Sequence, residues 1–437
     1  MSDSTKPNYT RAFIVVTSLF FMWGFITVLV DSLIPRLKEI FELTYFQAGL
    51  VQFAFFMAYF FLSIPSGFIL ARIGYKKGML LGLATMGIGC LLFWPAAELR
   101  IFEIFLVGYF VLAGGMTILQ VAANPYVSVL GDARTASSRL NLSQAFNSVG
   151  TTLAPIAGAM FILSDNIYSG DEIGLLSKAE KLGYYASEAS AVQAPFVVLA
   201  FALLALAALV AVVKLPDVLD TEHAGSYMKA MASKRLMMGA VGIFVYVGAE
   251  VAIGSYLVSY FLDMNMAEAI KNSDLLAGIS SSLLNTSDLA SIDAKGIVGA
   301  FVTFYWGGAM IGRFVGAYLT SVLSPGKVLG GFAIGAVLLL VISMSSTGLT
   351  AMLSILAVGL FNSIMFPTIF TIAIEDLGDL KPQGSGILCT AIAGGAIIPP
   401  LYGYCTDLAG FKLALLLLIV CYGYIFFYGV TSKRNLA

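Results

Sequence analysis

Charged residues, histidine and tryptophan are scarce in this sequence. Charged residues make up 11% of its 437 residues, and it holds one histidine and three tryptophans. Soluble domains carry about a quarter charged residues, which cover the surface that faces water. At the same time 59% of the residues are apolar, and a fold in water cannot hide so much apolar surface. The two features together exclude a water-soluble globular domain and indicate a membrane protein.

The few reactive side chains are not grouped for catalysis or for metal binding. His223 lies in a polar connection beside Glu222, where we expect a solvated loop residue rather than a base or a ligand. Neither HExxH nor GxSxG occurs in a suitable context, so an embedded enzyme is disfavoured and no cofactor is expected. The four cysteines fall in apolar stretches without CxxC spacing, which argues against disulfides and a zinc site: Cys90, Cys389, Cys405 and Cys421.

Apolar stretches long enough to cross a bilayer recur along the whole chain. A hydrocarbon core of about 30 Å requires a helix of about 20 apolar residues, because backbone polar groups in lipid must be satisfied within each segment. The sequence therefore predicts an all-α integral membrane protein with twelve transmembrane helices. The expected spans are 12–35, 45–71, 78–95, 101–129, 142–163, 195–213, 238–262, 296–320, 327–346, 349–374, 384–405 and 411–431.

The spans fall into two sets of six, which predicts two pseudo-symmetric halves. A six-helix bundle over 1–213 and another over 238–437 flank a linker, 214–237, that is rich in Lys and Arg. A weak repeat supports this division, since Pro125 and Pro155 in the first half match Pro367 and Pro399 in the second. Pro-interrupted helix pairs in corresponding positions are typical of duplicated transporters. Pro is also common in membrane helices generally, so the match alone is a weak argument.

The distribution of Lys and Arg orients the chain. Alternate loops counted from the N-terminus carry the excess of Lys and Arg, which in membrane proteins marks the cytoplasmic side. We therefore expect a multi-pass protein of the inner (plasma) membrane with both termini in the cytoplasm. The first span is too long for the apolar region of a signal peptide, so we expect it to be retained. Membrane lipid is an expected partner and nucleic acid is not, and we expect a monomer.

Two carboxylates lie well inside predicted spans, on the first helix of each half. Asp31 falls in the outer part of the first span and Glu250 near the middle of the seventh. A charged group at a helix centre costs about 2.5–3.5 kcal/mol on insertion scales, so each needs a compensating role. One interpretation is a buried hydrogen-bonded or ion-paired group. The other is a cation or proton site coupled to a substrate, with Asp31 as first choice for the cation (metal-ion) ligand and Glu250 as second.

Amide side chains accompany these carboxylates. Amides donate and accept hydrogen bonds at once, which suits a polyhydroxylated sugar better than an apolar solute. The aromatic rings of Trp23, Tyr256 and Tyr305 could stack on a pyranose ring, although most aromatics in such a chain belong to the core or to the interface belt. The candidate substrate-binding residues are Gln120, Asn124, Gln144, Asn147, Glu250, Tyr256 and Asn362.

Two arginines are candidates for gating. Arg72 lies in the stretch Gly67-x-x-x-x-Arg72-x-Gly74-x-Lys76-Lys77 after the second span, and Arg313 follows Gly312 in the eighth. The first stretch resembles the loop after the second helix of major facilitator proteins, but Ala71 stands where that motif has an acidic residue. The departure puts a charge relay in this half in doubt, and a plain cytoplasmic loop is the alternative.

Several longer stretches are similar to one transporter family, the fucose:proton and glucose/galactose symporters of the major facilitator class. They are FMWGFITVLVDSLIP (21–35), LQVAANPY (119–126), NLSQAFN (141–147), YVGAEVAIGSY (246–256) and FPTIF (366–370). The resemblance covers nearly all spans in order. It implies the twelve-helix major facilitator fold, with the substrate bound near the midplane between the halves.

Within that family the sequence resembles the glucose/galactose branch. Gly-Ala-Glu at Glu250 is similar to that branch, whereas the fucose carrier has glutamine there and has a glutamate where this chain has Gln120. The proton relay of the fucose carrier therefore does not transfer directly. Asp31 matches an acidic residue of both branches.

These observations predict a secondary active transporter that moves a hexose such as glucose or galactose together with a cation, by alternating access. Sodium is slightly favoured over a proton, because the residue at Gln120 does not titrate. The alternatives are a proton-coupled, fucose-type symporter and a passive sugar facilitator or sensor. The preferred hexose and the stoichiometry do not follow from the sequence.

Overall fold

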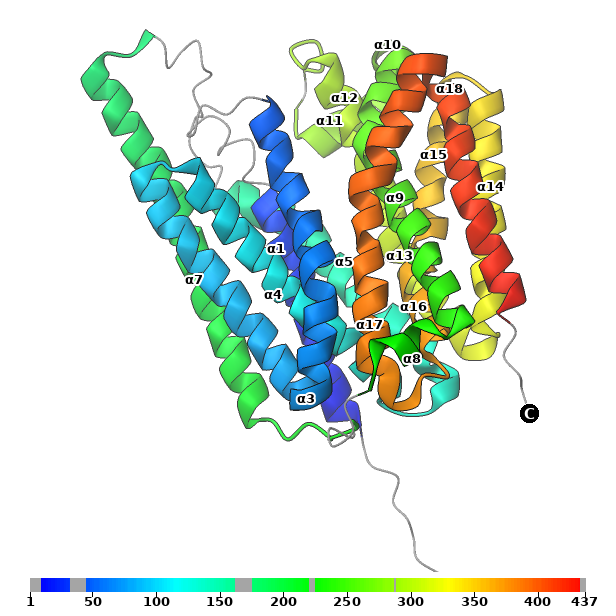
Figure 1. The fold of residues 1–437 in the computed structure, drawn as a ribbon. Helices are drawn as coiled ribbons and strands as arrows, with labels where there is room; N and C mark the ends of the chain where they lie inside the picture. The colour runs from blue at the N-terminus through cyan, green and yellow to red at the C-terminus, as the bar shows by residue number, and fades with distance from the viewer. Residues whose placement is uncertain (1–8, 32–44, 162–174, 220–224, 287, 433–437) are drawn as a thin grey trace, which may run out of the picture. The chain divides into compact units, whose positions relative to one another are not determined.

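The computed structural model describes residues 9–31, 45–161, 175–219, 225–286 and 288–432, and these are helical almost throughout (Figure 1). No strand occurs among them. Up to residue 231 the helices are α1 (Thr10–Asp31), α3 (Tyr45–Leu99), α4 (Phe102–Val129), η1 (Ala133–Thr135), α5 (Ala136–Phe161), α7 (Lys178–Val212) and α8 (Tyr227–Met231). Beyond it they are α9 (Lys234–Asp263), α10 (Met266–Lys271), α11 (Asp274–Leu284), α12 (Ala294–Ala300), α13 (Val302–Val322), α14 (Pro325–Ser345), α15 (Gly348–Asn362), α16 (Met365–Ile374), η2 (Gly378–Leu380), α17 (Lys381–Thr390), η3 (Ala391–Ala393) and α18 (Gly394–Thr431).

Each of the twelve predicted spans is helical over most of its described residues. In the described part of the chain, nine helical segments are long and apolar enough to cross a membrane. Two of the nine contain a non-helical glycine, Gly74 at φ 82° in α3 and Gly410 at φ 81° in α18, and each therefore holds two predicted spans. A positive φ is readily adopted by glycine because it has no Cβ. With α5 as the remaining predicted span, the all-α fold of twelve membrane helices is confirmed.

Three of the predicted spans are interrupted helices. The eighth breaks at Phe301 between α12 and α13, the tenth at 363–364 between α15 and α16, and the eleventh at η3. Pro367 lies in the first turn of α16, where its missing N–H would have no helical partner in any case. These breaks release backbone carbonyl groups, which require other donors inside the bilayer.

Helix α7 begins well before the expected sixth span, which starts at 195. Ser177 and Glu180 form a capping box: the Ser177 hydroxyl accepts from the Glu180 backbone N–H, and the Glu180 carboxylate accepts from that of Ser177. These hydrogen bonds lower the pKa of Glu180. Local capping therefore extends the helix beyond its apolar part.

The described helices group into two compact units. The first comprises Met1–Arg139, Phe146–Leu236 and Ile374–Thr390, and the second Leu140–Ala145, Met237–Ala373 and Ala391–Ala437. In the first unit α3 packs along α4 and α7, and α17 packs on α3 and α4. In the second, α14 packs against α15 and α18, and α13 against α15. The predicted boundaries at 213/214 and 237/238 stay a sequence prediction.

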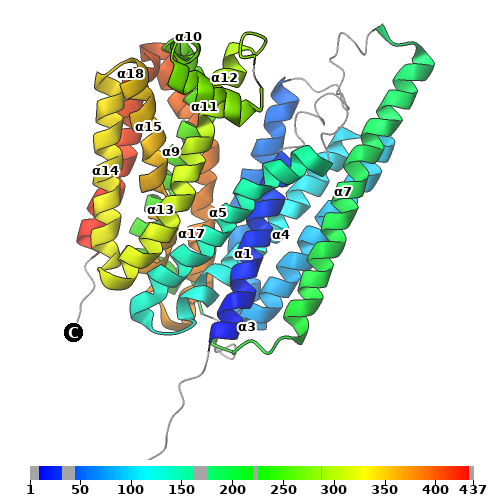
Figure 2. The same cartoon turned by 180° about the vertical axis from the view of Figure 1, so that it is seen from behind.

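Within the first unit α1 and α5 approach closely through glycines (Figure 2). A Cβ on Gly24 would overlap the backbone carbonyl oxygen of Asn147, and one on Gly150 would overlap that of Phe21. The two backbones therefore touch where side chains would otherwise separate them. Small residues at such contacts allow dispersion forces to hold membrane helices together.

Gly24→Ala should destabilise the protein, because the added methyl group has no room between α1 and α5. We expect a loss of about 1–3 kcal/mol in the free energy of unfolding, the usual effect of overpacking. Thermal unfolding of the purified protein in detergent measures it. Gly331→Ala in α14 is the matched control, since a Cβ there meets nothing within 4 Å. Equal stability of the two variants would contradict the proposed close contact.

Candidate substrate and cation site

The two amides of α4 have different surroundings. The Gln120 amide nitrogen donates to the hydroxyl of Tyr59 on α3, and both side chains are buried. Asn124, one turn further, is 0% exposed, and neither polar atom of its side chain has a hydrogen-bond partner among the described residues. Leaving a buried amide unsatisfied costs about 1–3 kcal/mol. Asn124 is therefore the α4 residue that most requires a ligand.

Gln144 and Asn147 of α5 lie three residues apart, which puts them on one helical face, yet they contact different helices. The Asn147 side-chain nitrogen donates to the backbone carbonyl of Phe20 on α1 at 2.9 Å. Gln144 uses its backbone carbonyl, which accepts from Arg313 of α13 at 3.4 Å. The Gln144 side chain is 5% exposed. Asn147 thus has a packing role, which does not prevent its oxygen from binding a ligand.

A buried polar group in the second unit joins α9, α13 and α15. The Asn362 side-chain nitrogen donates to the Tyr305 hydroxyl at 2.7 Å, and this hydroxyl donates to the backbone carbonyl of Glu250 at 3.4 Å. The Asn362 side-chain oxygen has no partner among the described residues. Like the Asn124 oxygen, it is a buried acceptor to which no described residue donates.

Arg313 stands beside this group. Its Nε donates to the backbone carbonyl of Ser363 at 3.2 Å, at the break between α15 and α16. The Arg313 guanidinium and the Tyr246 hydroxyl both interact electrostatically with the Glu250 carboxylate. Glu250 therefore has a cationic neighbour, which offsets part of the cost of burying its charge. The gating role of Arg313 stays a prediction.

The other predicted cation ligand is not described beyond its backbone. Helix α1 ends at Asp31, and the Asp31 side chain lies outside the described residues. Among the residues that are described, no group of three or more His, Cys, Asp or Glu could hold a metal ion. The role of Asp31 as cation ligand therefore stays a prediction.

Arg72 and its neighbours lie around the kink of α3. The Arg72 guanidinium carbon lies 4.0 Å from the ring centre of Phe68, and Gly74 supplies the kink. Lys76 donates to the carbonyls of Ala211 and Val213 at the end of α7, at 2.8 and 2.9 Å. A cation at a helix C-terminus is stabilised by the helix dipole. The motif that resembles a gating loop here ties α3 to α7, and gating by Arg72 itself stays a prediction.

A second cation that binds carbonyls at a helix end is Arg139, which is not among the residues predicted from the sequence. The Arg139 guanidinium donates to the carbonyls of Val127, Ser128 and Asp132 at 3.1, 2.7 and 2.8 Å, around the end of α4. Burial lowers the pKa of Arg139. The signal that could have found it is a basic residue soon after the end of a predicted helix.

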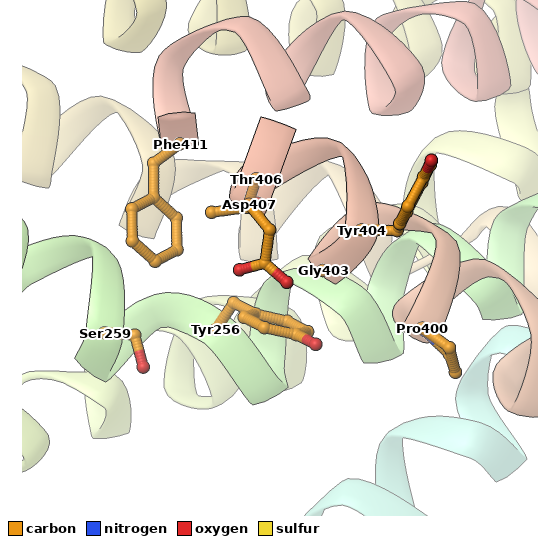
Figure 3. Close-up of a pocket in the computed structure, with 8 residues that line it drawn as sticks. All are labelled: Tyr256, Ser259, Pro400, Gly403, Tyr404, Thr406, Asp407 and Phe411. Atoms are coloured by element: carbon orange, nitrogen blue, oxygen red, sulfur yellow. The ribbon is translucent and has the colours of Figure 1, made fainter. Parts of the chain in front are cut away.

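Tyr256 lines a pocket of about 480 Å³ at the ends of α9 and of the first part of α18 (Figure 3). Of the three aromatics considered for sugar stacking, Tyr305 is wholly buried and Trp23 packs against Phe20 with ring centres 5.4 Å apart. Of these three aromatic residues, Tyr256 lines this pocket. The pocket is shared with Ser259, Tyr404, Thr406, Asp407 and Phe411.

Comparison with known proteins gives consistent matches along the whole chain. The model of the Major Facilitator Superfamily matches residues 12–400. A glucose/galactose transporter of Brucella abortus biovar 1 (strain 9-941) is 47% identical over 435 residues, 99% of this chain and 96% of that one. The L-fucose-proton symporter of Escherichia coli (strain K12) is 34% identical over 431 residues, 96% of this chain and 93% of that one. A crystal structure of the E. coli fucose:proton symporter FucP has a TM-score of 0.86 and 31% identity, covering 98% and 100% of the two chains.

Tyr305→Phe tests the polar group around Asn362. The variant deprives the Asn362 amide of its acceptor, so we expect a loss of about 1–3 kcal/mol in the free energy of unfolding. Thermal unfolding in detergent measures this loss. Tyr318→Phe is the control, because Tyr318 lies on the same helix and is 68% exposed. If both variants unfold like the parent protein, the Asn362 hydrogen bond does not stabilise the fold.

Proposed function

The chain belongs to the Major Facilitator Superfamily, and on this premise we propose that it carries a hexose across the inner membrane together with a cation. The observation that carries the proposal is the 47% identity, over 99% of the chain, to a protein named as a glucose/galactose transporter. The prediction that the chain is not an enzyme agrees with the names of its relatives, which are transporters and symporters. It is a multi-pass membrane protein.

The buried amides support a sugar as the cargo. Asn124 and Asn362 each keep buried polar atoms without partners among the described residues. A hexose offers hydroxyl groups that donate and accept, so its binding would satisfy these atoms where an apolar solute would not. We propose that Gln120, Gln144, Asn147 and Glu250 also contact the sugar, as the family resemblance implies.

Coupling is proposed to depend on Asp31, with Glu250 as the second group. In alternating access the carrier exposes its bound cargo to one side of the membrane and then to the other. The cation drives uptake only if the carrier that holds both sugar and cation changes conformation more readily than the carrier that holds one of them. Glu250 has Arg313 as an electrostatic neighbour, which makes it the less available of the two carboxylates for a cation.

Sodium and the proton are both retained as coupling ions. Gln120 supports sodium, because its amide lies in a neutral hydrogen bond with Tyr59 and cannot relay a proton. The name of the E. coli relative, a fucose-proton symporter, favours the proton.

Asp31→Asn should abolish uphill hexose uptake into proteoliposomes, because a neutral amide cannot provide the charge that binds the cation. Downhill exchange of labelled hexose should persist. Asp274→Asn, an exposed carboxylate in α11, is the matched control and should accumulate hexose like the parent. Full accumulation by the Asp31 variant would rule out its coupling role. A parent carrier that never accumulates hexose against a gradient would instead be a passive facilitator.

Exchange of ion gradients identifies the ion. A sodium-coupled carrier should accumulate hexose when a sodium gradient is imposed at equal pH on both sides. A proton-coupled carrier should ignore that gradient, respond to an imposed pH step, and make the outside more alkaline as hexose enters. The control is liposomes without protein under both gradients. Sodium-independent uptake driven by the pH step would establish the proton and overturn the preference for sodium.

A further inference from the structure

The pocket beside Tyr256 has walls that the fold holds in place. A Cβ on Gly403 would overlap the Tyr256 hydroxyl and lie 3.0 Å from its Cζ, so the Tyr256 ring lies directly on the backbone of α18. Tyr402 supports the same ring edge-on, with centres 5.3 Å apart. The absence of a side chain at Gly403 is what admits the ring. Tyr256 is therefore positioned by packing rather than left free at the surface.

The opposite wall is anchored in a similar way. Phe411 follows the kink at Gly410 and packs against Tyr260, with ring centres 5.8 Å apart. Tyr260 is fixed in turn by a hydrogen bond from its hydroxyl to the carbonyl of Ser343 at 3.1 Å. Two aromatic rings thus border the pocket, each held by a neighbour that is itself buried or bonded.

The pocket also contains a carboxylate. In Figure 3 the Asp407 carboxylate points toward Tyr256, with Phe411 alongside. No ion pair joins Asp407 to another described residue, and the nearby Lys412 instead donates to the carbonyl of Ser346 at 2.8 Å. The Ser259 hydroxyl lies on the same lining. Asp407 therefore presents an acceptor that no described cation neutralises.

We propose that this pocket binds the hexose itself, as a docking site distinct from the buried amides, and this proposal rests on the proposed function. A pyranose has an apolar face of C–H groups, which packs on an aromatic ring, and a rim of hydroxyls, which donate to a carboxylate. Tyr256 and Phe411 supply the rings, and Asp407 supplies the acceptor. A volume of about 480 Å³ is within the usual range for small-molecule pockets. In the predicted orientation the pocket opens on the outer side, from which the sugar arrives.

A bound cation is the competing occupant and fits less well. Hard cations require several oxygen ligands, and carboxylates are the preferred ones. Asp407 brings a single carboxylate, and the Thr406 hydroxyl already donates to the carbonyl of Tyr402 at 2.9 Å. Among the described residues no acidic cluster of three surrounds it. The pair of aromatic rings suits a sugar face better than a small ion.

The experiment measures protection of an introduced thiol in the pocket. Ser259→Cys is combined with Cys405→Ser, because Cys405 is partly exposed whereas Cys90, Cys389 and Cys421 are buried. A membrane-impermeant maleimide is added outside, with increasing glucose or galactose. We expect the hexose to slow the alkylation saturably. Adding Asp407→Asn should raise the half-protecting concentration about tenfold, as loss of a hydrogen bond to a charged group predicts.

Matched variants separate binding from damage. Asp274→Asn should leave the half-protecting concentration unchanged. Gly403→Ala should raise it by displacing Tyr256, whereas Gly423→Ala on the same helix should not, because a Cβ at Gly423 meets nothing within 4 Å. Hexose protection that ignores both Asp407→Asn and Gly403→Ala would place the sugar elsewhere and overturn the proposal.

The remaining outcomes distinguish the two proposals. Normal hexose uptake by the parent carrier without any protection would overturn the docking site and leave the proposed function intact. Protection by sodium at constant pH and ionic strength, without hexose, would show a cation in the pocket and also overturn it. A parent carrier that transports no hexose would remove the proposed function and this inference with it.

Discussion

The carbonyl groups at helix ends are the constraint on which this structure depends. The last four carbonyls of a helix have no partner within it, and hydrocarbon offers none. Four cationic side chains donate hydrogen bonds to such carbonyls, two in each unit. Lys76 binds the end of α7 and Arg139 that of α4, whereas Arg313 binds the end of α15 and Lys412 that of α14. Four of the 24 Lys and Arg residues thus have a structural role at a helix end.

Arg313 both binds a carbonyl at a helix end and lies beside a candidate functional residue. The break at 363–364 exposes the carbonyl of Ser363, and the guanidinium that satisfies it also compensates Glu250. Both side chains are only partly buried, so removing either charge would weaken this electrostatic interaction without leaving a fully buried charge behind. One arginine thus couples the integrity of an interrupted helix to the charge state of a candidate site.

The buried amides divide by whether the protein satisfies them. Gln120 and Asn147 donate to neighbours within the first unit, to Tyr59 and to the carbonyl of Phe20. Asn124 and Asn362 retain polar atoms without partners among the described residues. A fold keeps such atoms at a cost in stability, and a ligand that satisfies them recovers that cost as affinity. Asn124 and Asn362 are therefore the two amides that we propose most strongly as sugar ligands.

The sequence by itself determined that the chain lies in a membrane, that it is helical and where its twelve spans lie. The length of an apolar run and the scarcity of charge can be read directly along the chain. It also located the turns at Gly74 and Gly410, where glycine and polar residues interrupt apolar runs. The prolines Pro367 and Pro399 marked the tenth and eleventh spans as interrupted, but the sequence did not place the breaks at 363–364 and at η3, nor predict the one at Phe301 in the eighth span.

The tertiary structure alone decided which candidates meet. Gln144 and Asn147 share a helical face in the sequence pattern, yet the Asn147 side chain donates to α1, whereas Gln144 contacts α13 through its backbone carbonyl. Arg313, a partner of Glu250, and Tyr305, the partner of Asn362, lie more than 50 residues away from them along the chain. The pocket of Tyr256 and Asp407 depends on Gly403, because a side chain there would overlap Tyr256 of α9. This requirement is visible only once α9 and α18 are known to be in contact. Periodicity reports which residues share a face, and packing decides what that face touches.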